Sequence, residues 1–193
     1  MYYSSKSVLP HSGYSLIEVL VAVTILLIVI TGPLTIMTQT ARSSSLATEQ
    51  VTAFFLAQEG LELAQALRDD YILRSLGGDG TATWTAFETA VLDCLPNIDS
   101  NGCGLEITSS GGLPDIVETS CNANNCQLYL SADSTEQSRF TYDDTSPNTQ
   151  TPFSRRITIE PIGLNDEVRV VSEVTWVNDN VAAVQRVRSE TYL

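Results

Sequence analysis

The sequence predicts an α+β protein. A long N-terminal helix, membrane-embedded in its first half, packs through its second half on a small C-terminal antiparallel sheet. Three observations predict this arrangement. An uncharged run of 19 residues covers Val19–Met37, apolar positions then recur with helical spacing, and the C-terminal region alternates apolar and polar residues between turn signals. A loop-rich region with four cysteines lies between helix and sheet.

Length and charge limit the possible functions. A chain of 193 residues has room for one compact domain and an extended element, and a hydrophobic content of 43% allows a real core. The net charge is −13, and the only lysine and the only histidine, Lys6 and His11, lie near the N-terminus. Such a surface repels phosphates, so we expect no binding of nucleic acid.

The uncharged run is long enough to cross a bilayer, which needs about 20 apolar residues in a helix. Gly32 and Pro33 interrupt it. Because proline removes a helix hydrogen bond, we expect a kink or a locally melted stretch there. Glu18 lies at the start of the apolar segment with no basic residue in the run to pair with it. An intramembrane acid is costly unless it is paired or reaches the interface.

Three interpretations of this segment compete. A secretory signal would keep its apolar region free of acids and end at small residues, so Glu18 disfavours it. A plain membrane anchor leaves Glu18 unexplained. Cleavage between Gly13 and Tyr14 would instead create an α-amino group four residues from Glu18. That amine is able to neutralise Glu18 within one helix or between neighbouring subunits.

The residues G-Y-S-L-I-E-V-L-V-A-V, from Gly13, resemble the class III signal of type IV pilins and pseudopilins. The resemblance implies that a prepilin peptidase cuts after Gly13 and methylates Tyr14 as the new N-terminus. It also implies that Glu18, the fifth mature residue, recruits and registers subunits during assembly. Tyr14 departs from the usual Phe or Met. The later residues L-A-Q-E-G-L-E-L-A-Q-A-L-R-D resemble minor pilins and pseudopilins of the type IV pilus modification group.

This resemblance implies four parts: a leader (1–13), a transmembrane and filament-core helix (14–37), its amphipathic continuation (38–75) and a globular pilin-like domain (76–193). The implied partners are other pilin or pseudopilin subunits, the prepilin peptidase, the inner-membrane assembly platform and the membrane. The implied location is the cytoplasmic (inner) membrane, single-pass, with the globular domain extracytoplasmic, and an extracellular filament after assembly. No cofactor is implied.

Beyond the apolar run, the helical spacing predicts one core-facing stripe. Its members step by three or four residues: Ala47, Val51, Phe54, Ala57, Leu61, Ala64, Leu67 and Tyr71. In the middle region, 83–94 reads as a short helix with Trp84, Phe87, Val91 and Leu92 inward. The residues 128–130 and 140–142 read as short strands.

The cysteines Cys94, Cys103, Cys121 and Cys126 suggest disulfides and an oxidising compartment. Of the three possible pairings, Cys94–Cys103 with Cys121–Cys126 closes the shortest loops and is the one we expect. A zinc site is the alternative, but the spacings C-x8-C and C-x4-C with no nearby histidine do not favour it.

The C-terminal region predicts three or more antiparallel strands. Ile157 and Ile159 alternate with polar residues, Pro161 suits a strand end, and turns are expected at 165–166 and 178–180. A chain beginning at Tyr14 has no histidine or lysine, which excludes histidine triads and Schiff-base lysines. The residues 143–148 offer oxygens that would suit Ca²⁺, or they form a solvated turn.

The function favoured by the sequence is therefore that of a non-enzymatic, minor pilin-like subunit of a type IV pilus. A pseudopilin of a type II secretion system is the nearest alternative. A single-span anchor carrying an extracytoplasmic binding module is the alternative from another class.

Overall fold

The computed structural model resolves two compact units, Met1–Ser45 and Leu46–Leu193, and each is described by itself. The described residues are 13, 15–76, 78, 80–96, 102–110, 113–121, 126–132, 139–163, 167–178 and 181–193. Tyr14, most of the leader and the expected turn at 165–166 lie outside them. The fold is α+β, as the sequence predicts.

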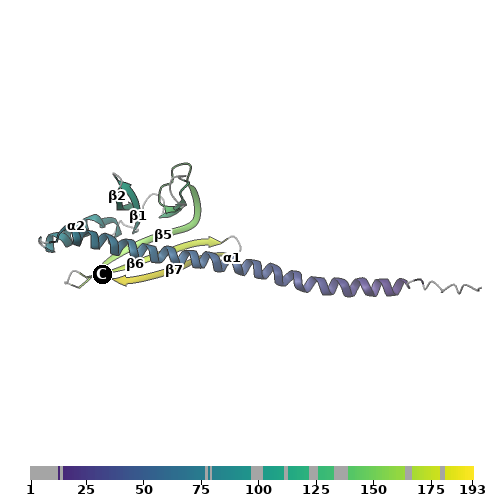
Figure 1. Ribbon diagram of the computed structural model, residues 1–193. Coiled ribbons are helices and arrows are strands. Elements are labelled where there is room, and N and C mark those ends of the chain that lie inside the picture. The colour runs from purple at the N-terminus through teal and green to yellow at the C-terminus, as the bar shows by residue number, and fades with distance from the viewer. Residues whose placement is uncertain are drawn as a thin grey trace, which may run out of the picture. The chain divides into compact units, whose positions relative to one another are not determined.

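Helix α1 covers Leu16–Arg74 and has 59 residues (Figure 1). The carbonyl of Ser15 accepts the amide of Val19, and Glu18 lies in the first turn, where the exposed amide groups favour an acid. Gly32 and Pro33 are both helical, so the chain is not melted at this point. The kink expected at these residues stays a prediction.

The middle region contributes two short helical segments to the second unit. Helix α2 covers Gly80–Ala90 and the 3₁₀ turn η1 covers Leu92–Cys94. Phe87 and Val91 are buried, as predicted. Leu92 was expected to point inward but is 52% exposed. The reason is that α2 ends at Ala90, and in the 3₁₀ turn that follows Cys94 is the side chain that enters the core.

In the part of the chain that the structure describes, seven strands form one antiparallel sheet. They are β1 (Cys103–Ser110), β2 (Leu113–Ser120), β3 (Gln127–Leu130), β4 (Phe140–Thr141), β5 (Thr149–Ile162), β6 (Glu167–Asn178) and β7 (Val181–Tyr192). The predicted short strands correspond to β3 and β4, and the predicted C-terminal strands to β5, β6 and β7. The hairpin of β1 and β2 was not predicted.

Strand β5 organises the sheet. One of its edges pairs with β6 from Phe153 to Ile162, and β6 in turn pairs with β7. The other edge is shared, because β3 pairs with its first half and β1 pairs at Ile157. Pro161 lies one residue from the end of β5, as predicted. The middle region therefore extends the small C-terminal sheet on its far edge.

The second half of α1 runs beside β5, β6 and β7 (Figure 1). The predicted stripe is correct for Ala57, Ala64 and Leu67, which are buried, but wrong for Val51 and Phe54, which are 54% and 47% exposed. Ala47, also in the predicted stripe, is exposed. The buried face instead consists of Ala53, Leu56, Ala57, Gly60, Leu63, Ala64 and Leu67. Its small residues bring the helix backbone close to the sheet.

Gly60 shows how close this approach is. A Cβ at Gly60 would lie 2.5 Å from Oγ of Ser172 on β6 and 3.3 Å from Cδ1 of Ile157. A side chain there would require Ser172 and Ile157 to move, so only glycine fits this position without rearrangement. Two hydrophobic clusters fill the interface, one centred on Leu67, Phe87 and Ile159 and the other on Leu56 and Trp176.

Candidate functional site

The apolar segment of α1 in the first unit has no cover from the described residues. Its large hydrophobic side chains, from Leu16 to Met37, are between 47% and 83% exposed. By length and composition, α1 passes the test for a membrane-spanning helix, a test that signal sequences and buried core helices also pass. Because this segment is not buried in its own chain, it needs lipid or other subunits around it.

The threonine hydroxyls inside this segment are satisfied within the helix. The hydroxyls of Thr24, Thr31 and Thr35 donate to the carbonyls of Val21, Ile28 and Thr31, at 2.8, 3.0 and 3.0 Å. Glu18 is the one charged residue between Leu16 and Ala41. The segment therefore has a single charged group, the Glu18 carboxylate, and it lies at the beginning of the segment.

The structure places Gly13 three residues before α1, in an exposed position. No heavy atom lies within 4 Å of the position that a Cβ at Gly13 would take. Nothing in the described part of the chain therefore blocks access of a peptidase to this residue. Tyr14, the other half of the expected cleavage site, lies outside the described residues.

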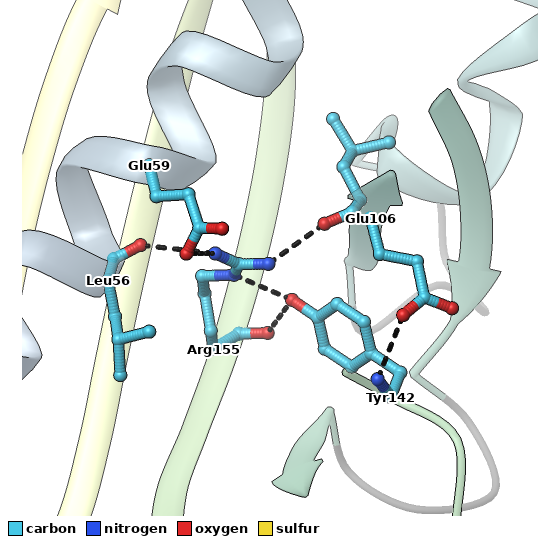
Figure 2. A network of polar contacts seen from close by, with 6 residues as sticks. Leu56, Glu59, Glu106, Tyr142 and Arg155 are labelled. Carbon is cyan, nitrogen blue, oxygen red and sulfur yellow. Dashed lines mark hydrogen bonds and ion pairs between the residues drawn. The ribbon is translucent and has the colours of Figure 1, made fainter. Parts of the chain in front are cut away.

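In the second unit, the principal polar feature is a buried arginine on β5 (Figure 2). The side chain of Arg155 is 1% exposed. Its Nη1 donates to Oε2 of Glu59 at 2.8 Å and its Nη2 to the carbonyl of Leu105 on β1 at 2.8 Å. Its Nε donates to Oη of Tyr142 at 2.8 Å. One guanidinium thus joins the helix, β1 and the residue after β4.

Electrostatics keep this guanidinium charged. Burial by itself lowers the pKa of Arg155, but Tyr142 and Glu59 oppose it and the pKa is raised. Burial also raises the pKa of the Tyr142 phenol, with Arg155 acting against it, so the phenol stays neutral. Its Oη donates to the carbonyl of Arg155 at 3.0 Å. The charge of Arg155 is balanced by Glu59, whose side chain is 48% exposed.

Glu106 and Gly104, both on β1, position Tyr142. Oε2 of Glu106 accepts the amide of Tyr142 at 3.1 Å and the hydroxyl of Thr141 at 2.7 Å. The Tyr142 ring lies directly on Gly104, where a Cβ would come within 2.7 Å of three ring carbons. Contacts with β1 therefore orient the phenol toward Arg155.

Sequence reasoning missed this network, although a signal was present. Arg155 has the same strand parity as Phe153 and Ile157, and side chains two residues apart on a strand share a face. An arginine on the buried face of a strand requires an acceptor set in the core. Residues of the network come from four separate elements, so its other members were not predictable from spacing.

A second polar contact fastens the start of the helix–sheet interface. Oε2 of Glu49 on α1 accepts Nδ2 of Asn178 at 2.6 Å and Nε1 of Trp176 at 3.2 Å. Both donors lie at the end of β6. Together with the Arg155 network, this contact sets where the sheet sits along α1.

The predicted disulfides are present in the middle region. They join Cys94 to Cys103 and Cys121 to Cys126, the pairing that closes the shortest loops, each with a Cα–Cα distance of 4.6 Å. Glu118 lies beside the first, with potential ligand atoms of all three residues within 4.8 Å. Since both sulfurs are in a disulfide, this group offers no thiolate to zinc. Burial raises the pKa of Glu118, while the amide of Asp93 opposes this.

The residues considered for calcium form a turn in which the carboxylate of Asp143 accepts hydrogen bonds from within the turn. Asp143 accepts the amide of Thr145 at 3.0 Å and its hydroxyl at 2.8 Å. The side chain of Asn148 donates to the Asp143 carbonyl at 3.1 Å, and its Oδ1 accepts from Ala132. The solvated-turn interpretation therefore accounts for these residues without a cation.

The pKa of Asp143 gives a direct test of this turn. The amide and then the hydroxyl of Thr145 hold it below the ordinary value of 3.8. Because a lowered pKa favours the carboxylate in the folded state, this stabilisation is present above that value and is lost as pH falls through the folded pKa. We expect Thr145→Val to raise the pKa of Asp143, measured by NMR titration. Thr191→Val, on β7, serves as control, and an unchanged pKa in Thr145→Val would contradict the assignment.

The fold and the N-terminal segment define a class: an α+β domain that follows an apolar N-terminal helix with one acid in its first turn. A comparison with known protein families assigns the N-terminal segment more closely. Residues 10–32 match the family described as the prokaryotic N-terminal methylation motif. The match supports the class III signal of type IV pilins and pseudopilins, so the chain carries the N-terminal segment of a pilin-like precursor. No curated protein and no solved structure matched the chain.

Proposed function

We propose that the chain is a minor pilin-like structural subunit of a type IV pilus. It is made in the cytoplasmic membrane, cut after Gly13 by a prepilin peptidase, methylated at Tyr14 and assembled through its apolar helix. The observation that carries the proposal is the methylation motif at residues 10–32, together with a helix whose apolar surface the described residues leave exposed. The domain boundaries 1–13, 14–37, 38–75 and 76–193 belong to this proposal.

The chemistry of assembly follows from one charge. Cleavage creates an α-ammonium group four residues before Glu18, the one charged residue of the apolar segment. When the helix leaves lipid for a helical bundle, both charged groups lose their polar surroundings. Burying either charge costs free energy unless the two groups pair. Glu18 of one subunit accepts the N-terminal amine of its neighbour. This contact joins different surfaces of the two copies, so it propagates into an open helix.

The mechanism requires no enzyme activity of the subunit. The motif points to a structural subunit. The globular unit, in which Arg155 and Glu49 join the sheet to the second half of α1, is carried outside the membrane. A bend at Gly32 and Pro33 would let the helix extend when the filament is stretched.

Intact-mass measurement of the protein from its own membrane tests the processing. We expect a chain that has lost residues 1–13 and gained one methyl group. Gly13→Leu should leave the leader attached. A side chain at this position meets no atom of the subunit, so the substitution should affect recognition by the peptidase and not folding. A control substitution, Ser5→Leu, should be processed normally. Recovery of the native protein with residues 1–13 intact would overturn the proposal.

That outcome would favour a single-span anchor with an extracytoplasmic binding module. A type II secretion pseudopilin shares the motif and the processing, so mass alone does not separate it from a pilin. Deleting the gene separates them: a loss of surface pili supports the pilus, whereas a loss of protein secretion with intact pili supports the pseudopilus.

A further inference from the structure

Strand β7 forms an unpaired edge of the sheet (Figure 1). Among the described residues it pairs with β6 alone, and it has 12 residues without a proline or a glycine. The other two edges are weaker templates for pairing, because β4 has two residues and β2 carries Pro114. A long edge strand presents a row of free backbone groups, so a further strand is able to add to it.

The backbone hydrogen bonds of β7 show which of its groups are free. The amide of Leu193 donates to the carbonyl of Val168 at 2.9 Å, and the carbonyl of Leu193 accepts the amide of Val168 at 3.1 Å. Leu193 thus points both groups at β6. Because this direction alternates along an antiparallel strand, the even-numbered residues of β7 point their amides and carbonyls away from β6. The side chains of these residues are exposed: Val184, Arg186, Arg188, Glu190 and Tyr192.

The charges along this edge complement a second copy of the same strand. The side chains of Arg188 and Glu190 are 49% and 46% exposed. When two copies of β7 run antiparallel with a twofold axis at Ser189, Arg188 of each copy lies opposite Glu190 of the other. In the same register, Arg186 lies opposite Tyr192, whose ring attracts a cation. These opposed residues are even-numbered, so each pair is able to exchange both backbone hydrogen bonds.

Neighbouring registers place like charges opposite one another. An axis at Arg188 sets the two copies of this arginine face to face, and an axis at Val187 sets Arg186 opposite Arg188. An axis at Glu190 sets two carboxylates together. Like charges directly opposite destabilise a strand pair. The register centred on Ser189 is therefore the one that places Arg188 opposite Glu190 twice and contains no like-charged pair.

We propose that β7 is a homodimerisation edge, to which a second copy of this chain adds its own β7 in the antiparallel register centred on Ser189. The partner is a second copy because the edge satisfies its own charges in this register. Elsewhere the net charge of −13 keeps copies of the chain apart. The inference goes beyond the proposed function, and it does not depend on processing at Gly13.

The pairing reverses the direction of one copy relative to the other. Strand β6 runs against the second half of α1, since Glu49 contacts Asn178 at the end of β6 and Gly60 lies against Ser172 nearer its middle. Strand β7 therefore runs in the same direction as this part of α1. A twofold contact does not belong to an open helix, in which all copies share one direction. In a pilus, β7 pairing would join copies from two filaments of opposite direction.

Cysteine crosslinking tests the register. Across the twofold axis, the two copies of Ser189 form a non-hydrogen-bonded pair with Cα atoms about 4.5 Å apart, a separation that a disulfide spans. We expect the full-length Ser189→Cys chain, purified in detergent, to form a covalent dimer when treated with oxidised glutathione. In Thr191→Cys, the matched control, the two cysteines would be about 13 Å apart along the strands and should not join. Equal crosslinking of the two variants, or none at position 189, would overturn the proposal.

Charge reversal tests the pairing of Arg188 with Glu190. Arg188→Glu and Glu190→Arg should each weaken self-association by about tenfold or more, because each places like charges opposite one another twice. An equimolar mixture of the two variants should associate like the native chain, since the reversed charge of one variant then meets the opposite charge of the other. Sedimentation velocity of the full-length chains in detergent measures this.

A control separates this effect from that of net charge. Glu62→Arg makes an equal change of charge at an exposed position of α1 and should associate like the native chain. A native chain that stays monomeric at about 100 μM would overturn the proposal, because that limit excludes all but very weak pairing. A mixture of the two reversed variants that fails to associate would contradict it as well.

The two proposals fail differently. If the native chain keeps residues 1–13 in its own membrane, the proposed function fails, while β7 pairing is measured on the purified chain and is unaffected. If the chain is processed and assembly depends on Glu18, but position 189 gives no crosslink and charge reversal has no effect, only this inference fails.

Discussion

Arg155→Met should lower the free energy of unfolding of the globular unit by about 3 kcal/mol or more, because four acceptors lose their donor and each buried hydrogen bond contributes about 1 kcal/mol. The acceptors are Glu59, the carbonyls of Leu56 and Leu105, and the phenol of Tyr142. Methionine fills much of the space of the aliphatic stem, so the change reports lost polar contacts more than lost volume. Chemical denaturation followed by circular dichroism measures the effect.

A double-mutant cycle shows whether Arg155 and Glu59 act together. Glu59→Leu alone should cost about 2 kcal/mol or more, since it leaves a buried guanidinium without its carboxylate. Once Arg155 is methionine, the same change at Glu59 should cost little, because Glu59 is then a half-exposed acid with no buried partner. Additive effects would contradict a coupled pair. Glu62→Gln, at an exposed position one turn away on α1, should leave stability unchanged within about 0.5 kcal/mol.

Glu18→Ala should abolish most filament assembly while cleavage after Gly13 continues. The expected loss is about tenfold or more in assembled subunit, because the neighbour's α-ammonium group would be buried without a partner. The globular unit should unfold as in the native protein, since Glu18 belongs to the other compact unit. Assembly is measured as sheared extracellular filament, and processing by intact mass of the membrane fraction.

A matched control separates this role from a general effect of charge. Glu62→Ala removes an exposed acid from the same helix and should assemble normally. If Glu18→Ala assembles as well as the native chain, the pairing assigned to Glu18 is wrong, although cleavage after Gly13 would still identify a pilin-type precursor. If Glu18→Ala is not cleaved, its effect on assembly reports processing instead, and the pairing role would lose its support.

The outward position of Val51 and Phe54 illustrates one limit of the sequence. From Val51 to Ala57 the chain reads V-T-A-F-F-L-A, so apolar residues occur around most of the helix and form two apolar faces. Helical spacing alone does not choose between them. The face with Ala53, Ala57 and Gly60 packs on the sheet. At Gly60, Ser172 and Ile157 lie too close to leave room for a larger side chain.

The hairpin of β1 and β2 shows another limit. The residues 109–112 read S-S-G-G, which indicates a turn in the sequence. The residues on either side of it are largely polar and alternate only weakly. Their assignment depends on pairing with each other over Cys103–Ser110 and on the bridge to β5 at Ile157. Such pairing energies come from partners distant in the chain, and a local pattern does not contain them.

The sequence by itself determined the long helix, its uncharged run with Glu18, the alternating strands β5 to β7 and the disulfide pairing with the shortest loops. Each of these is a local property, because periodicity, length and short loop closure act between near neighbours in the chain. Only the tertiary structure decided which face of α1 is buried and that Arg155 is the polar centre of the core. Both depend on acceptors and surfaces that the fold brings together from distant segments, where close packing selects one arrangement.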